Sequence, residues 1–180
     1  MHTCDLCGSQ TSEPLYREFS LSFCPACQLA PLTAWKATGG LYEETRESYR
    51  DDSNRNMLKV NLAWHRRLKT PIMAQFCHER FWHKLGKLFR AEIQTGDPLF
   101  DQTVFISTNT ETETRSLLRN DGVQSALMVL CYRATVIIGL HHVVMQWLGY
   151  ESDYEEASSL AGTALALHVE HWAEHSSSAI

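Results

Sequence analysis

The pattern of apolar and polar positions divides the chain into three parts. Residues 1–36 form a short cysteine-rich module, and residues 37–55 form a polar stretch of mixed charge that contains Gly39-Gly40. From residue 56 to residue 180 apolar residues recur with helical and strand periods. We interpret the polar stretch as a linker, with a loose helical piece around Glu43–Tyr49, and residues 56–180 as one domain.

Two amphipathic helices are predicted at the start of this domain. Over residues 56–69 the residues at helical spacing are Leu58, Leu62, His65 and Leu68. Thr70-Pro71 then supplies an N-cap and a first helical residue. Apolar residues recur behind it from Ile72 to Phe89, so a second helix is predicted there.

Strands and helices alternate in the remainder of the domain. A short strand, a turn at Gly96-Asp97-Pro98 and a β-rich run from Thr103 to Ser107 come first. Two helices separated by a break at residues 120–122 follow, then apolar residues 134–149, which we interpret as two strands hinged at Gly139 or one long bulged strand. A final helix is predicted over 153–175, with acidic residues in its first turn. The predicted fold class is α+β, with amphipathic helices packed on a small sheet.

Composition narrows the class of protein only moderately. The chain has 180 residues, is 44% hydrophobic and carries a net charge of −5. Its longest apolar region, 134–149, is interrupted by His141, His142 and Gln146, so no transmembrane segment is predicted. Cys4 and Cys7 stand where a secretory leader would lie, and we therefore expect a cytoplasmic protein. In a reducing compartment, paired cysteines are more often metal ligands than disulfides.

Charge is distributed unevenly along the sequence. Residues 59–90 hold eight basic residues and a single acid, Glu79, whereas the six acids from Glu151 onward have no basic residue among them. Candidate contacts to a nucleic acid or a protein partner in the basic region are Arg66, Arg67, Lys69, Arg80, Lys84 and Lys87. The aromatic residues between them also fit the cores of amphipathic helices, and the acidic C-terminal helix could be an internal partner for the basic face.

Two Cys-x-x-Cys pairs give the most specific chemical signal. The pairs are Cys4/Cys7 and Cys24/Cys27, and sixteen residues separate them. This spacing suits a tetrahedral zinc ion with four thiolate ligands, and Gly8 lets the backbone turn toward the sulfur atoms. Such a zinc ion is structural because no coordination position stays open. A thioredoxin-like redox pair and disulfides are the alternatives, and each fits less well.

The cysteine module resembles the zinc-ribbon superfamily. The resemblance covers residues 1–36, where apolar residues between the pairs predict a small hairpin, and it implies that the metal supplies the folding free energy. Gln28 departs from the pattern, since a glycine is usual after the second pair.

A second resemblance rests on the motif Thr-Gly-Asp-Pro-x-Phe-Asp. The matching residues are Thr95, Gly96, Asp97, Pro98, Phe100, Asp101, Phe105, Leu117 and Leu118. This region resembles a domain family of bacterial proteins without an established activity. It implies an α+β fold and no catalytic residue.

The remaining polar residues offer weaker candidates. His168, His171 and His175 share a helix face and could bind a metal, although a solvated helix end explains them better. Cys77, His78 and His83 could belong to a catalytic cluster, but Cys77 and Cys131 also fit core positions. Asp97 and Asp101 could form a carboxylate pair, but their place beside Pro98 favours local hydrogen bonding in a turn.

We expect a non-enzymatic, zinc-containing module that binds another protein. An inhibitor of the immunity or antitoxin type is one version of this hypothesis. The alternatives are a nucleic-acid-associated regulator that uses the basic residues, and an enzyme with a dispersed site near His141/His142 and Asp97/Asp101. No Walker loop, dinucleotide fingerprint or nucleophile elbow supports a particular reaction.

Overall fold

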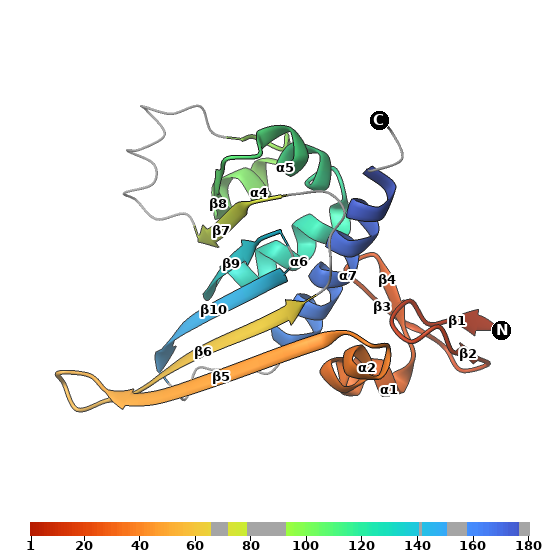
Figure 1. The fold of residues 1–180 in the computed structure, drawn as a ribbon, viewed down its shortest axis with the longest axis horizontal. Helices are drawn as coiled ribbons and strands as arrows, with labels where there is room; N and C mark the ends of the chain where they lie inside the picture. Colours follow the sequence, from red (N-terminus) through yellow and green to blue (C-terminus); the bar gives the residue numbers. More distant parts are fainter. Residues whose placement is uncertain (66–71, 79–92, 141, 151–157, 177–180) are drawn as a thin grey trace.

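The computed structural model describes residues 1–65, 72–78, 93–140, 142–150 and 158–176. These residues form an α+β structure around a six-stranded antiparallel sheet with the strand order β5-β6-β10-β9-β7-β8 (Figure 1). The strands are β5 (Leu41–Arg50), β6 (Asn56–His65), β7 (Ala74–His78), β8 (Val104–Thr108), β9 (Ala134–Ile138) and β10 (His142–Tyr150). The fold class therefore agrees with the sequence-based prediction.

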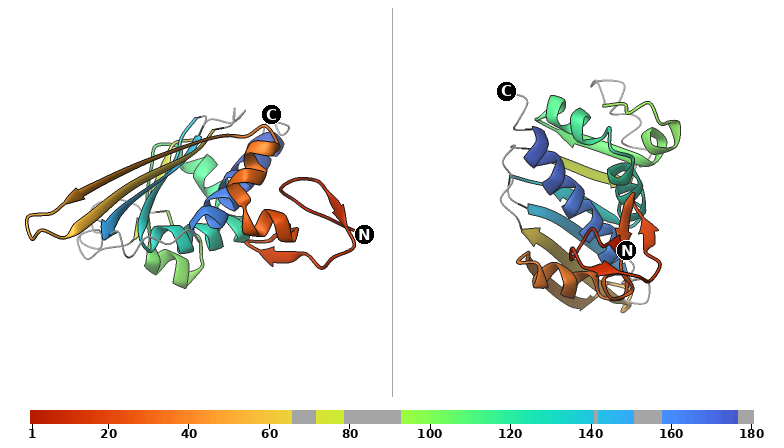
Figure 2. Two further views of the ribbon diagram at one scale, coloured as in Figure 1. Left: turned by 90° about the horizontal axis from the view of Figure 1, so that it is seen from below. Right: turned by 90° about the vertical axis from the view of Figure 1, so that its right-hand side faces the viewer.

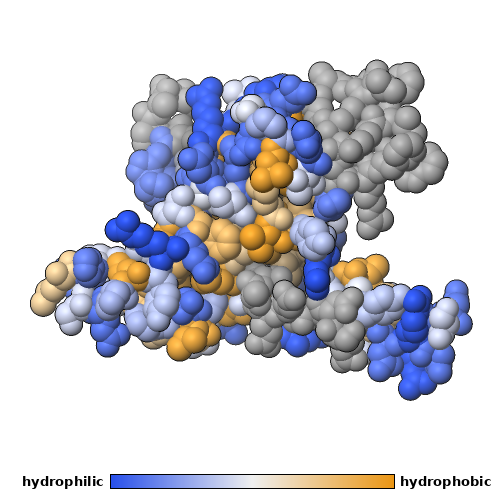
Figure 3. All heavy atoms as spheres, turned by 180° about the vertical axis from the view of Figure 1, so that it is seen from behind, coloured by the Kyte–Doolittle hydropathy of each residue, from blue (hydrophilic) through white to orange (hydrophobic). Residues whose placement is uncertain are grey.

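One face of the sheet is covered by helices. Helix α7 (Ser158–Ser176) crosses this face and packs against α6 (Asp121–Cys131), as the second view of Figure 2 shows. Two shorter helices, α4 (Pro98–Thr103) and α5 (Glu111–Leu117), flank β8. Seen from behind the view of Figure 1, apolar residues gather near the middle of the molecule and polar residues cover the tip of the β5–β6 hairpin (Figure 3).

Side chains alternate between the two faces of the sheet. On β6 the residues buried beneath the helices are Leu58, Val60, Leu62 and Trp64, whereas the residues between them are exposed or only partly buried. Trp64 donates a hydrogen bond to Thr163 of α7 at 3.1 Å, and its ring lies where any side chain at Gly162 would have to be. The core thus lies between the sheet and α6/α7, and the opposite face carries no described helix.

Strand β5 is the exposed edge of the sheet. It pairs with β6 along its whole length, from Leu41 opposite His65 to Arg50 opposite Asn56, yet nine of its ten residues are exposed. Together the two strands form a long hairpin, which we call the arm. It extends well beyond the helices in two views (Figures 1 and 2).

Several predicted elements at the start of the domain are wrong. Residues 56–65, predicted as a helix, form strand β6, and residues 74–78, predicted as part of a second helix, form strand β7. The predicted linker 37–55 contains all of β5, including the piece expected to be helical. The rest of both predicted helices, with the Thr70-Pro71 cap, lies outside the described residues.

The elements predicted for residues 95–175 are confirmed where the structure describes them. The β-rich run is β8, and α5 and α6 are separated at Asn120, whose side chain caps α6 by accepting from the amides of Gly122 and Val123. The apolar run is two strands joined around Gly139, and the last helix is α7. Acidic residues 153–156, predicted for its first turn, lie outside the described residues.

The N-terminal module is small and irregular. It contains two short hairpins, β1 (His2–Thr3) with β2 (Gln10–Thr11) and β3 (Tyr16–Glu18) with β4 (Leu21–Phe23), followed by helices α1 (Pro25–Leu29) and α2 (Pro31–Ala37). Its buried residues Leu6, Phe23 and Trp35 belong to the same apolar cluster as the core of the sheet. Among the described residues, no helix has both the length and the apolar character needed to cross a bilayer.

Candidate metal centre

The first cysteine pair lies in a tight turn after β1. The amide of Gly8 donates to the carbonyl of Cys4 at 2.9 Å, and the amide of Cys4 donates to the carbonyl of Ser9 at 3.0 Å. Gly8 has φ +70°, a left-handed conformation that glycine adopts without steric cost. This turn brings Cys4 and Cys7 to the same side of the loop, as the position of Gly8 in the sequence predicts.

The second pair lies at the start of a helix. Cys24 is the N-cap of α1, Pro25 takes the first helical position, and the amide of Gln28 donates to the carbonyl of Cys24 at 3.0 Å. Cys27 follows within the same turn and is 3% exposed. Gln28 therefore closes this turn, although a glycine is usual at its position after the second cysteine pair of a zinc ribbon.

The two turns bring the four sulfur atoms together. All four lie within 4.8 Å of one another, and the sulfurs of Cys7 and Cys24 are 3.9 Å apart. Sulfur atoms that share a tetrahedral zinc ion at ~2.3 Å would be separated by about 3.8 Å. The four cysteines could therefore hold a metal ion, which is what their spacing predicts.

Hydrogen bonds and burial act on these thiols in opposite directions. The hydroxyl of Ser9 lies 3.0 Å from the sulfur of Cys7 and lowers the pKa of that thiol to about 6. Burial raises the pKa of the Cys27 thiol well above its usual range. The backbone amide of Cys24 also points at the sulfur of Cys4, at 3.3 Å. Such amide contacts stabilise negative charge on sulfur, which suits a bound cation.

One histidine adds hydrogen bonds to the apolar contacts between the module and the α+β core. His168 of α7 is 6% exposed, and its Nε2 donates to the carbonyl of Phe19 at 2.7 Å. Its Nδ1 then accepts from the side-chain amide of Asn120 at 3.3 Å. Phe19 and Ser20 form the turn between β3 and β4, and both have positive φ. The sequence does not predict this contact, since it joins positions 149 residues apart.

The backbone of α6 comes unusually close at this contact. A Cβ built on Gly122 would lie 2.3 Å from Nε2 of His168 and 2.4 Å from the carbonyl oxygen of Phe19. Only glycine leaves room there, so α6, α7 and the module meet at one point. A cavity of about 710 Å³ beside it is lined by Asp5, Glu170, His171 and Glu174 among others.

The other predicted chemical residues are dispersed. Asp97 caps α4, and Asp101 accepts from the amides of Thr95 and Gly96, so the Thr-Gly-Asp-Pro-x-Phe-Asp motif forms a turn rather than a carboxylate pair. His171 and His175 lie together at the end of α7, 4.1 Å between ring centroids, whereas His168 is buried against Phe19. The predicted three-histidine face is therefore divided.

The remaining candidates fall on strands or outside the described residues. Cys131 is a core residue, 1% exposed, and Cys77 lies on β7 rather than on a helix. Arg66, Arg67, Lys69, Arg80, Lys84, Lys87, His83 and His141 all lie outside the described residues. The predicted nucleic-acid contacts therefore stay a prediction.

Sequence reasoning named His142 as a candidate but missed the polar residues that lie near it. His142 lies directly opposite His65 in the sheet, and Glu43 of β5 reaches the same imidazole. Strand register is the signal that could have found them, but the sequence-based assignment of 56–65 as a helix hid it.

Comparisons of the chain with protein-family models, with curated proteins and with solved structures found no match.

Proposed function

We propose that this chain is a non-enzymatic protein-binding module, stabilised by a structural zinc ion and binding its partner along the outer edge of β5. The observation that carries the proposal is the exposure of the arm. β5 borders the sheet, and in the part of the chain that the structure describes no strand pairs with its outer edge. Backbone amides and carbonyls on such an edge are a ready template for an added strand.

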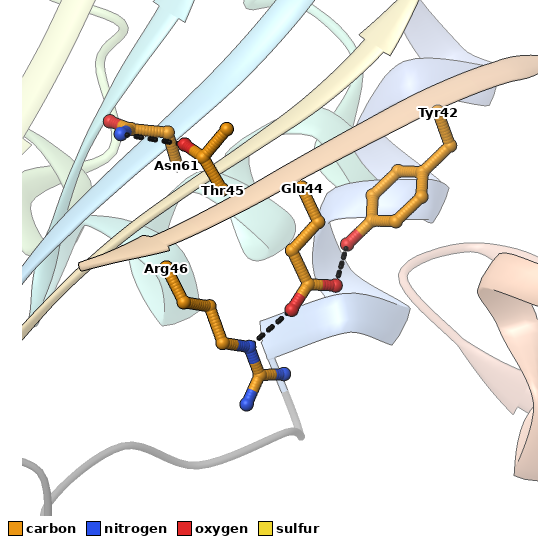
Figure 4. A network of polar contacts seen from close by, with 5 residues as sticks. All are labelled: Tyr42, Glu44, Thr45, Arg46 and Asn61. Carbon is orange, nitrogen blue, oxygen red and sulfur yellow. Dashed lines mark hydrogen bonds and ion pairs between the residues drawn. The ribbon is translucent and has the colours of Figure 1, made fainter. Parts of the chain in front are cut away.

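Side-chain contacts between exposed residues accompany the pairing of β5 with β6. On one face Glu44 accepts from the hydroxyl of Tyr42 at 2.8 Å and from the guanidinium of Arg46 (Figure 4). On the other face the amide of Asn61 donates to Thr45 at 3.2 Å. Pairing with β6 orders β5 before any partner arrives, which reduces the entropy lost on binding.

The charges along β5 limit the registers in which a second copy of the chain could pair with it. In a two-fold antiparallel pair, directly opposite residues lie on the same face of the sheet. Each symmetric register that overlaps by about seven residues or more places like charges opposite each other. The opposed like charges are Glu44 with Glu44, Glu43 with Glu47, Arg46 with Arg46, or Glu47 with Glu47, depending on the register. The second and fourth of these registers also place Glu44 opposite Arg46 or Arg50, so charge disfavours only the two registers in which Glu44 or Arg46 faces its own copy.

The partner that fits is an extended segment of another protein with complementary charge. A basic residue opposite Glu47 and an acidic residue opposite Arg50 would match the outer half of the strand. A small inhibitor of the immunity or antitoxin type would act in this way, by covering a surface of its toxin. The four-cysteine site supports a structural role for zinc, because four thiolates leave no position for a substrate.

A charge exchange on β5 tests the proposal. We expect the Glu47→Lys/Arg50→Glu variant, which keeps the net charge, to lose the partner captured from the native cell. The matched control is Arg17→Glu/Glu18→Lys on exposed strand β3, which should retain it. In the complex, hydrogen exchange at amides 41–50 should slow. Retention of the partner by the β5 variant, or its loss from the β3 control, would contradict the proposal.

A further inference from the structure

Strand β5 is a long and regular edge. All ten residues of Leu41–Arg50 pair with β6 in one register, without a bulge or a proline. In the described part of the chain, no further strand pairs with the outer side of β5. Proteins usually blunt such an edge or cover it, because its unpaired amides and carbonyls accept a strand from another chain. An occupant is therefore expected on this edge even when the partner proposed above is absent.

Charge on the helix side of the sheet favours one symmetric register for a second copy of the chain. Glu44 and Arg46 lie on this side, since the residues opposite them on β6 are buried. When Thr45 lies on a two-fold axis, Glu44 of each copy lies directly opposite Arg46 of the other. Each copy already joins these two side chains in an ion pair of its own (Figure 4). The two copies together would form an alternating group of two carboxylates and two guanidinium groups.

Apolar residues on the opposite face of β5 favour the same register. Leu41 is 70% exposed and Tyr49 is 45% exposed, near the two ends of the strand. With Thr45 on the axis, Leu41 of each copy lies directly opposite Tyr49 of the other, where apolar side chains can cover each other. The two neighbouring symmetric registers place a glutamate opposite Leu41 or Tyr49 instead. One register thus pairs opposite charges on one face and apolar side chains on the other.

The like charges in this register have basic side chains beside them. Glu43 of one copy lies opposite Glu47 of the other. Lys59 of β6 lies directly opposite Glu47 in the sheet, and its Nζ is 3.6 Å from that carboxylate. Nε2 of His65 is 3.5 Å from the carboxylate of Glu43. Lys59 therefore offsets part of the repulsion between the two carboxylates.

We propose that a second copy of the chain occupies the outer edge of β5 when no other partner is bound, with Thr45 on the two-fold axis. This inference rests on the proposed function in that both occupants use the same edge, so that partner binding separates the two copies. The pairing joins the two sheets into one continuous antiparallel sheet. Backbone hydrogen bonds provide affinity, and the paired side chains set the register.

Self-association of the purified, reduced chain tests this pairing in the absence of any other protein. Sedimentation equilibrium at micromolar concentrations should find a mass twice the 20.5 kDa of one chain. Glu44→Arg and Arg46→Glu should each raise the dissociation constant about tenfold or more, because like charges then face each other twice. An equimolar mixture of these two variants should dimerise again, because the arginines of one then face the glutamates of the other.

The double variant Glu44→Arg/Arg46→Glu provides the control for the register. It exchanges the two charges and should dimerise like the wild type, because the two positions face each other. Glu18→Arg, on exposed strand β3, is the control for net charge and should leave the dimer unchanged. An unchanged circular dichroism spectrum reports that each variant remains folded.

A wild-type chain that stays monomeric overturns the proposal, as does a mixture of the two single variants that stays monomeric. Loss of the dimer in the double variant or in Glu18→Arg would also contradict it. None of these measurements involves the captured partner, so failure of this inference and failure of the proposed function are distinguishable.

Discussion

At the scale of single residues, His168 connects parts of the chain that are distant in sequence. Its neutral form satisfies both ring nitrogens, because Nε2 donates to Phe19 and Nδ1 accepts from Asn120. Asn120 cannot turn its oxygen toward a protonated Nδ1 without giving up the cap of α6, since that oxygen already accepts from Gly122 and Val123. Protonation of Nδ1 of His168 would therefore break its hydrogen bond with Asn120, which joins α7 to the start of α6.

We predict that acidification destabilises the protein through His168. Burial lowers the pKa of His168 below its ordinary value of 6.5. As the pH falls, the unfolded chain therefore takes up the proton before the folded chain does. The contribution of His168 to the free energy of unfolding is fully present above about pH 6.5 and is lost as the pH drops toward the lowered pKa. Asp5, which favours the charged form, and His171, which opposes it, face the same region together with Glu170 and Glu174.

Urea unfolding of the wild type and of His168→Gln at several pH values checks this prediction. The variant should be less stable at neutral pH but should lose less stability between about pH 6.5 and 5. An equal loss in both proteins would show that other groups cause the pH dependence.

At the scale of elements, the junction of α6, α7 and the β3–β4 turn depends on close backbone approach. We predict that Gly122→Ala separates them, because the added Cβ would meet both His168 and the Phe19 carbonyl. The free energy of unfolding should fall by about 1–3 kcal/mol. Amides of residues 16–23 should exchange faster with solvent.

The control for this variant is Ser125→Ala, at an exposed position of the same helix. It should leave both stability and exchange nearly unchanged, since alanine is a good helix former. Equal protection of residues 16–23 in Gly122→Ala would contradict the prediction.

Sequence periodicity was decisive for some elements and misleading for others. Leu58 and Leu62 fit both a helix and a strand, because residues four apart share a face in either structure. Val60 and Trp64 decide for the strand, since both are buried with the leucines at a period of two. Apolar and polar residues do not alternate along β5, because the strand is exposed on both faces. It is ordered by pairing with β6, which its own sequence does not reveal.

At the scale of the whole molecule, the cysteine module and the sheet domain share one apolar cluster. Leu6 and Phe23 pack in the same cluster as Leu127, Leu165 and the residues beneath the sheet. A module of this size buries too little surface to fold alone, and a metal ion held by the four cysteines would supply folding free energy. Metal binding and docking of the module should therefore support each other.

We predict that metal removal destabilises the whole chain and not only the module. Cys27→Ser, or a strong chelator, should reduce the metal content from one zinc per chain to none at the four-cysteine site and lower the melting temperature. The control is Cys77→Ser, at a half-buried thiol outside the four-cysteine site, which should keep the metal. An unchanged melting temperature after metal loss would contradict the prediction, because it would show that metal binding to the module does not stabilise the core.

The sequence by itself determined the local features. Cysteine spacing with Gly8, the Asp97 turn, the Asn120 break and the Gly139 hinge each depend on residues a few positions apart, and the structure contains all four. Tertiary structure decided the rest. The strand identity of β5 and β6, the His65–His142 pair and the His168–Phe19 contact arise from pairing across long sequence separations, because local propensity carries no record of which strand becomes the neighbour.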